Sequence, residues 1–232
     1  MINLLLSLFQ NINFLIEYLF KKGLNEKKLY QEKITKDQVI VFDIGSNLGN
    51  YLNFVSKVFS NKNLELHSFE PIKKLLKQQK VNHGNLVKNN VAVTDKAGKI
   101  QFYERKISSQ SSVFQSSNFE NDIISDSYDV TTLNIADYIF KNSITHIDIL
   151  KIDVEGKELE ILNTIKNHFD KIYIKIIKIE TSFQGHIDES FEKLLEIYKL
   201  LNNNNYEYFG ATNIKYKNNK IFFCDSYFVL KK

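Results

Sequence analysis

Short apolar runs alternate with longer segments of helical period from Val39 onward. The runs have the length of buried strands, and the segments between them place apolar residues three and four positions apart, as amphipathic helices do. Strands that alternate with helices in this way predict an α/β fold with a mostly parallel sheet and helices on both faces. The predicted strands are Val39–Ile44, Leu64–Phe69, Val87–Val93, Ile147–Val154 and Ile172–Ile179.

Further elements extend this alternation. We expect an extra strand at Ile100–Tyr103 and a loop rich in Ser and Gln at Ser108–Ser117. Tyr206–Phe209 and Ile221–Leu230 are expected to form an antiparallel pair near the end of the sequence. The expected inner faces of the helices are Tyr51, Phe54, Val55 and Val58, then Ile72, Leu75 and Leu76, then Leu159, Leu162, Ile165 and Phe169, and last Phe191, Leu194, Leu195, Tyr198 and Leu201.

The first 24 residues are apolar but are interrupted by polar residues. Apolar positions from Ile2 to Leu19 lie three and four apart, which predicts an amphipathic helix. No apolar run reaches the roughly 18 residues of a spanning helix, and no basic region or cleavage site indicates a signal peptide. We favour a helix that packs on its own chain over one that contacts a membrane or a second copy. Residues 1–36 are therefore predicted as a helix with a charged connector (residues 21–36), and residues 37–232 as the main domain.

Composition excludes several classes of protein. Of the 232 residues, 43% are hydrophobic and 25% are charged, which is typical of a globular chain. One proline and 8 glycines exclude collagen-like and proline-rich architectures. The single cysteine, Cys224, excludes an internal disulfide and a cysteine-rich zinc site. The net charge of +4 comes from interspersed Lys and Glu, so it gives little support for nucleic-acid binding.

A glycine loop, Asp43-Ile-Gly-Ser-Asn-Leu-Gly49, follows the first predicted strand. Ligands bind outside the carboxyl ends of parallel strands, and glycines let the backbone approach them closely. The loop lacks the Lys of a P-loop, and Asn47 and Asn50 replace two glycines of the dinucleotide fingerprint. The remaining interpretation is the Asp-x-Gly-x-x-x-Gly loop of enzymes that bind S-adenosylmethionine, with a purely structural turn as the alternative.

Acidic side chains recur at the ends of two further strands. Glu70 ends the second strand, about 20 residues after the glycine loop, where a carboxylate accepts the hydroxyls of a ribose. Pro71 then suits the first turn of a helix. Leu150–Gly156 reads Leu-Lys-Ile-Asp-Val-Glu-Gly and brings charges into an apolar strand and its exit, where they are costly unless paired or functional. An internal Lys–Asp pair with an acidic helix start is the alternative explanation.

Taken together, these motifs resemble those of the FkbM-type methyltransferase family. The resemblance covers about residues 39–180 and rests on the order of the glycine loop, Phe69-Glu-Pro71, Asn90-Val-Ala-Val93, Ser111-Ser112 and Leu150–Gly156. It implies a class I, Rossmann-like fold with a mostly parallel sheet of seven strands. It also implies S-adenosylmethionine as the cofactor and O-methylation, often of sugars, glycans or secondary metabolites, as the reaction.

The resemblance further implies how the cofactor is held. The glycine loop would hold the methionine part, Glu70 the ribose, and residues 90–92 the adenine, while Asp153 and Glu155 would line the methyl-transfer site. The expected cofactor-binding residues are Asp43, Gly45, Ser46, Asn47, Gly49, Asn50, Glu70, Pro71, Asn90, Val91, Ala92 and Asp153.

Methyl transfer to a hydroxyl needs a base that accepts the hydroxyl proton. The candidate bases are Asp153, Glu155, Glu180 and His186, of which His186 lies in the loop after the last parallel strand. The three carboxylates are also suited to share a Mg²⁺ ion, but no further ligand set is evident, and we expect no metal. Ser111, Ser112 and Arg105 are the expected substrate-binding residues, with a flexible linker as the alternative for the serines.

Rival functions conflict with particular residues. A nicotinamide-dependent oxidoreductase on the same fold conflicts with the broken fingerprint at Asn47 and Asn50. A non-catalytic protein that binds a membrane or a partner through residues 1–24 conflicts with the intact Asp43, Glu70 and Asp153. A nucleic-acid methyltransferase is disfavoured because no basic stripe with interleaved aromatics is present. We expect a cytoplasmic enzyme with a small-molecule or glycan acceptor, with membrane contact only through residues 1–24, and with a homodimer left open.

Overall fold

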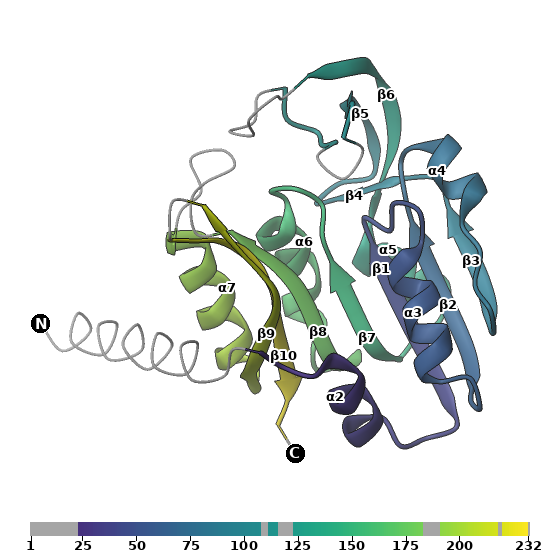
Figure 1. The fold of residues 1–232 in the computed structure, drawn as a ribbon, viewed down its shortest axis with the longest axis vertical. Helices are drawn as coiled ribbons and strands as arrows, with labels where there is room; N and C mark the ends of the chain where they lie inside the picture. The colour runs from purple at the N-terminus through teal and green to yellow at the C-terminus, as the bar shows by residue number, and fades with distance from the viewer. Residues whose placement is uncertain (1–22, 108–110, 116–122, 183–190, 218–219, 232) are drawn as a thin grey trace, which may run out of the picture.

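The computed structural model describes residues 23–107, 111–115, 123–182, 191–217 and 220–231 (Figure 1). The helix predicted within residues 1–24 falls almost entirely on residues 1–22, which lie outside the described residues. Among the helices of the described residues, none is long and apolar enough to cross a membrane.

A seven-stranded sheet forms the centre of the molecule (Figure 1). Its strands are β1 (Gln38–Ile44), β2 (Asn63–Phe69), β3 (Asn85–Asn89), β7 (His146–Ile152), β8 (Tyr173–Ser182), β9 (Tyr206–Lys217) and β10 (Lys220–Leu230). Their order in space is β3-β2-β1-β7-β8-β10-β9. The first five of these run parallel to one another, and β10 runs antiparallel to β8 and β9. The predicted Rossmann-like sheet and the antiparallel pair that follows it are therefore confirmed.

Helices cover both faces of this sheet, because successive residues of each strand point to opposite faces. The helices are α2 (Glu26–Lys33), α3 (Asn50–Val58), α4 (Lys73–Gln78), α5 (Ile135–Lys141), α6 (Glu158–Ile165), the 3-10 turn η2 (Lys166–His168) and α7 (Phe191–Asn203). On one face, α2 and α3 pack with Val41, Leu66 and Ile149. On the other face, α5, α6 and α7 pack with residues such as Phe42 and Leu150. Two hydrophobic cores thus enclose the sheet.

A smaller sheet lies beyond the carboxyl ends of the parallel strands (Figure 1). Its strands are β4 (Ala92–Thr94), β5 (Gly98–Arg105) and β6 (Ile124–Asn134), in the order β4-β6-β5. β6 pairs parallel with β4 and antiparallel with β5. Phe102 and Val130 of this sheet pack with Ile72 beside α4 in a separate small core. The small sheet therefore forms a wall next to the ends of β1 and β2.

Residues 21–36, which were predicted as a charged connector, instead contain α2. Asn25 caps this helix, since its Oδ1 accepts the N–H of Lys28 at 3.0 Å. Leu29 and Tyr30 are completely buried, although most other positions of the helix are polar or charged. Two adjacent apolar residues give no helical period, so the helix could be found only from its packing against the sheet.

The strand predicted at Val87–Val93 is divided between the two sheets. β3 ends at Asn89, and β4 begins at Ala92. Between them, Asn90 Nδ2 donates to the carbonyl oxygens of Glu70 and Pro71 at 3.0 and 2.8 Å, which turns the chain from one sheet to the other. β6 and α5 were not predicted, because the β6 segment is mostly polar and exposed and takes its order from pairing with β5.

Candidate active site

A cavity of about 660 Å³ lies outside the carboxyl ends of β1, β2, β7 and β8. The chain runs from β1 to β2 on one side of the sheet and from β7 to β8 on the other, so the strand order reverses between β1 and β7. In open α/β sheets this reversal is where ligands bind. Side chains from α2, α3, the small sheet and the β9–β10 pair complete the walls. Candidate residues from the ends of three strands, Glu70, Asp153, Glu155 and Glu180, therefore line one cavity.

The glycine loop turns sharply from β1 into α3. Gly45, Asn47 and Gly49 have φ values of 79°, 48° and 76°, in the left-handed region that favours glycine. The N–H groups of Gly45 and Ser46 both donate to the carbonyl oxygen of Phe69, at 3.0 and 3.1 Å, so the loop is tied to the end of β2. The residues of this loop and of the start of α3 that line the cavity are Gly45, Ser46, Asn47, Leu48 and Asn50. Gly49 shapes the turn without lining the cavity.

A buried polar cluster that sequence reasoning missed holds this loop in place. Ser46 Oγ lies 2.6 Å from Ser68 Oγ, and Ser68 Oγ donates to Gln79 Oε1 at 2.6 Å. Gln79 Nε2 in turn donates to Ser46 Oγ and to the carbonyl oxygen of Asn47, at 2.8 and 2.7 Å. Gln79 follows α4 and had no distinguishing pattern in the sequence, so only the folded chain shows that it supports the loop.

Glu70 joins the glycine loop to the turn before α4. Its Oε2 accepts the N–H of Asn47 and its Oε1 accepts the N–H of Ile72, both at 2.8 Å. Burial raises the pKa of Glu70 to about 7, although these two hydrogen bonds act to lower it. A carboxylate oxygen can accept two hydrogen bonds, so both oxygens of Glu70 keep capacity for hydroxyl groups in the cavity that Glu70 lines.

Lys151 lies between two carboxylates at the end of β7. Its Nζ contacts Asp43 Oδ1 at 3.0 Å and Asp153 Oδ2 at 3.1 Å. Burial acts to lower the pKa of Lys151, but the charges of Asp153 and Asp43 raise it by a larger amount. The pKa of Lys151 is therefore raised overall, and the lysine stays protonated. The Lys–Asp pair considered as an alternative from sequence is thus present. Asp43 is completely buried and is not among the residues lining the cavity, so it holds Lys151 instead of facing a ligand as predicted.

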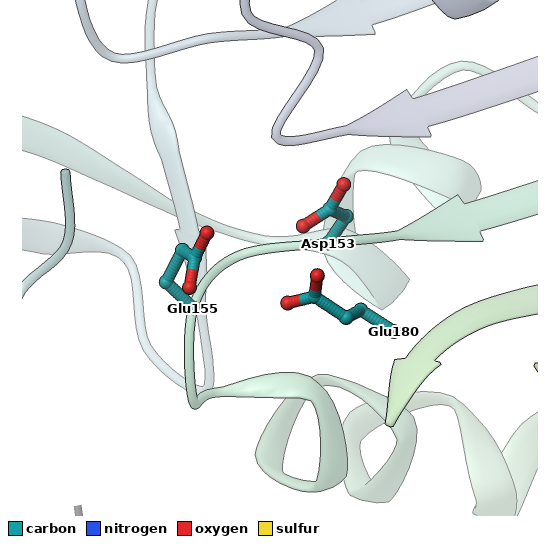
Figure 2. A group of neighbouring side chains, drawn as sticks. All are labelled: Asp153, Glu155 and Glu180. Atoms are coloured by element: carbon teal, nitrogen blue, oxygen red, sulfur yellow. The ribbon is translucent and has the colours of Figure 1, made fainter. Parts of the chain in front are cut away.

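Asp153, Glu155 and Glu180 turn their carboxylates toward one another (Figure 2). Asp153 and Glu155 follow β7, Glu180 lies near the end of β8, and one oxygen of each lies within 4.8 Å of the other two. Burial, followed by the charge of Asp153, raises the pKa of both Glu155 and Glu180. Three of the four candidate bases named from the sequence therefore lie together at the ends of two neighbouring strands.

The far wall of the cavity carries a second buried lysine that the sequence analysis did not single out. Lys178 of β8 contacts Glu26 Oε1 of α2 and Asp225 Oδ2 of β10, each at 3.1 Å. Its Nζ also lies 4.7 Å from the ring centroid of Tyr51 in α3. Lys178 interrupts an apolar strand just as Lys151 does, so the same signal was available in the sequence. Its two acidic partners are distant in the chain and needed the structure.

The segment Ser111–Gln115 lies against β5. Ser112 and Tyr103 exchange backbone hydrogen bonds at 2.9 and 3.2 Å, and Ser111 lines the cavity. Arg105 is 2% exposed and donates to Ser112 Oγ at 3.3 Å and to the carbonyl oxygen of Phe114 at 2.9 Å. The prediction that Arg105 and Ser112 contact a substrate therefore needs correction, since neither lines the cavity and both hold the segment in place.

Some of the remaining residues predicted to bind the cofactor line the cavity, and one does not. Pro71, Val91 and Ala92 line the cavity, whereas Asn90 turns the chain behind it. His186 lies outside the described residues.

The arrangement fits the parts of S-adenosylmethionine in sequence. Glu70 offers carboxylate oxygens for ribose hydroxyls, and the apolar side chains beside it suit the faces of an adenine ring. The glycine loop packs directly against the end of β7, because any side chain at Gly45 would overlap the carbonyl oxygen of Asp153. The apolar residues beside Glu70 are Ile72, Ala92, Phe102 and Val113.

Comparison with protein families agrees with this fit. The model of the methyltransferase FkbM domain matches residues 43–208, which contain the glycine loop, Glu70 and the carboxylate cluster. The sequence matches none of the curated proteins with which it was compared.

Solved structures of methyltransferases match the chain at low sequence identity and with TM-scores below 0.5. A methyltransferase FkbM from Methylobacillus flagellatus KT is 14% identical with a TM-score of 0.49, over 96% of this chain and 53% of that one. Magnesium protoporphyrin IX methyltransferase from Synechocystis PCC 6803, with bound SAM, is 7% identical with a TM-score of 0.46, over 88% and 76%. TrmK from M. capricolum, in complex with S-adenosyl-homocysteine, is 14% identical with a TM-score of 0.41, over 90% and 70%.

Proposed function

The chain belongs to the FkbM methyltransferase family, whose cofactor is S-adenosylmethionine, and we propose that it methylates a hydroxyl oxygen of a sugar, a glycan or another small acceptor. One observation carries this proposal. A single cavity runs from the glycine loop and Glu70, past three clustered carboxylates, to a polar wall formed by residues of β8, β9 and β10. Donor and acceptor therefore have separate ends with proton-accepting groups between them.

The donor end is defined by Glu70 and the glycine loop. S-adenosylmethionine supplies an activated methyl group, so the protein mainly has to align the reactants and exclude water. Glu70 is positioned to fix the ribose, because its two oxygens are already held by the N–H groups of Asn47 and Ile72. Lys151, Asp43 and Asp153 form a buried ionic group that keeps the end of β7 rigid beside the loop.

The centre of the cavity supplies the base. An acceptor oxygen forms a bond to the methyl carbon as the carbon–sulfur bond breaks, and the hydroxyl proton passes to a carboxylate. Burial and the charge of Asp153 raise the pKa of Glu155 and of Glu180, so each carboxylate holds an accepted proton more tightly than an exposed glutamate does. Asp153 is already paired with Lys151, so Glu155 and Glu180 are the favoured bases.

The acceptor end carries hydrogen-bonding and aromatic side chains. Asn213, Lys215 and Asp225 line this wall together with Phe223 and Tyr51. Alternating polar groups and rings suit a hydroxyl-rich acceptor, because hydroxyls need directed partners while the ring faces of a sugar need apolar contact.

Calorimetric titration with S-adenosylhomocysteine, with NAD in parallel, tests the donor end. We expect the wild-type protein to bind S-adenosylhomocysteine and not NAD, and Glu70→Gln to weaken binding about tenfold, since one buried acceptor is lost. Glu32→Gln, which changes an exposed carboxylate in α2 that does not line the cavity, serves as the matched control.

Transfer of a labelled methyl group to a panel of sugars and other hydroxyl compounds tests the acceptor end. Labelled product of ether chemistry supports the proposal. Binding of NAD alone would favour an oxidoreductase, and binding of neither compound would favour a non-catalytic protein.

A further inference from the structure

Three acidic groups, Asp153, Glu155 and Glu180, converge at one point of the cavity. Lys151 is a basic side chain in contact with this carboxylate cluster, and this lysine serves Asp43 as well as Asp153. The guanidinium of Arg105 donates to Ser112 Oγ and to the carbonyl oxygen of Phe114, and its charge also acts to lower the pKa of Glu155.

One oxygen of the cluster is both enclosed and unsatisfied. Glu155 Oε2 is buried and accepts no hydrogen bond, although the rest of the side chain borders the cavity. A neighbouring acid shows the contrast, because Glu158 accepts the N–H groups of Val154 and Gly156 at 3.0 and 3.1 Å. Burying a carboxylate oxygen without a partner is costly, so its position in the cluster indicates a ligand that satisfies it.

We propose that Asp153, Glu155 and Glu180 bind a divalent cation of the oxygen-preferring class, such as Mg²⁺ or Mn²⁺. Their oxygens converge within 4.8 Å of one another, which a small contraction brings onto the roughly 2.1–2.5 Å coordination sphere of such an ion. Asp153 uses Oδ2 for Lys151, so its Oδ1 is the oxygen left for the cation.

The donor set also selects against softer metals. Among the described residues that line the cavity, none is a histidine or a cysteine, the ligands that zinc prefers. Three carboxylates leave coordination positions open toward the cavity for water or for acceptor oxygens.

The consequence for the reaction rests on the proposed function. An acceptor oxygen bound to the cation loses its proton more readily, and Glu155 or Glu180 need not then act alone as a base. Open positions on one ion fit an acceptor with two adjacent oxygens, such as a vicinal diol. The cation site thus narrows the acceptor class from any hydroxyl compound to compounds that bind a cation through two adjacent oxygens.

Titration of the metal-free protein with Mn²⁺, followed by electron paramagnetic resonance of the free ion, tests the site directly. We expect one bound Mn²⁺ per chain, displaced by excess Mg²⁺. Glu155→Gln and Glu180→Gln should each weaken Mn²⁺ binding at least tenfold, since losing even an outer-shell partner costs about 10–100-fold. Both variants should still bind S-adenosylhomocysteine, which shows that they are folded.

Glu70→Gln is the matched control, because Glu70 lines the same cavity outside the cluster. It should weaken S-adenosylhomocysteine binding and leave Mn²⁺ binding unchanged. The cation site is refuted if wild-type protein that binds S-adenosylhomocysteine takes up no Mn²⁺, or if Glu70→Gln weakens Mn²⁺ binding as much as Glu180→Gln does. If the wild-type protein does not bind S-adenosylhomocysteine, the proposed function is refuted instead, whatever the Mn²⁺ result.

Discussion

The carboxylate of Glu70 holds two backbone segments together while it faces the cavity. Its hydrogen bonds to the N–H groups of Asn47 and Ile72 fix its orientation, and its burial raises its pKa to about 7. The sequence was sufficient to place Glu70 at a strand end beside the glycine loop. It did not indicate that the same carboxylate supports the loop, because Asn47 and Ile72 approach it only in the fold.

The raised pKa predicts that binding of S-adenosylhomocysteine depends on pH. Below pH about 7, Glu70 is protonated and must lose its proton before both oxygens can accept ribose hydroxyls, so affinity should increase as the pH rises from 6 to 8. Glu70→Gln should be weaker and should lack this step in calorimetric titrations. If the affinity of the variant still increases between pH 6 and 8, another titratable group causes the pH dependence. Stability changes in the opposite direction, because a carboxyl with a raised pKa contributes fully below the unfolded value and loses this contribution as the pH rises through 7.

Gly45 should tolerate no side chain. Its φ is 79°, and a Cβ there would overlap the carbonyl oxygen of Asp153. We expect Gly45→Ala to lower the free energy of unfolding by about 3 kcal/mol or more, since the left-handed backbone alone costs about 1–2 kcal/mol. Gly23→Ala is the matched control, because Gly23 has a φ of 82° but no atom near the added Cβ. Equal losses in urea unfolding would show that the close approach to Asp153 does not matter.

At the scale of elements, helix α2 shows the limit of periodicity. Repeated apolar positions in the sequence predict the strands and the long helices, but α2 buries only Leu29 and Tyr30. It nevertheless belongs to the core on the α3 face of the sheet and brings Glu26 to the cavity. A segment that looks like a connector therefore completes one wall of the site.

Truncation of Leu29 tests whether α2 is an integral element. Leu29→Ala should lower the free energy of unfolding by about 2–5 kcal/mol, because Leu29 is 1% exposed and leaves a cavity in the core. Leu48→Ala, at a leucine that is 41% exposed, should change it by less than about 0.5 kcal/mol. Urea unfolding monitored by circular dichroism gives both values, and similar values would mean that α2 is not docked in solution.

At the scale of the whole molecule, Lys178 connects segments from the beginning and the end of the described chain. It pairs with Glu26 of α2 and Asp225 of β10, and it lies over the rings of Tyr51 and Tyr227. These contacts join both ends of the fold at the acceptor end of the cavity. The ionic group thus makes the shape of the cavity depend on the complete sheet and not on the parallel strands alone.

Removal of the charged Lys178 side chain should therefore destabilise the entire domain. Lys178→Met should lower the free energy of unfolding by about 3–5 kcal/mol, because it leaves Glu26 and Asp225 without their buried partner. Lys28→Met breaks a Lys–Glu pair whose side chains are 72% and 56% exposed, and it should cost less than about 1 kcal/mol. Comparable costs in urea unfolding would contradict the linking role of Lys178.

The sequence by itself determined the alternation of strands and helices, the glycine loop and the acidic strand ends. These features depend on local period and residue type, and parallel strands bring their carboxyl ends to one edge whatever the details of packing. The tertiary structure decided which of these residues face the cavity. Asp43 and Arg105 proved to be buried supports, whereas Glu26, Lys178 and Asp225 proved to form a wall. Such roles depend on contacts between segments distant in the chain, and no local pattern specifies those contacts.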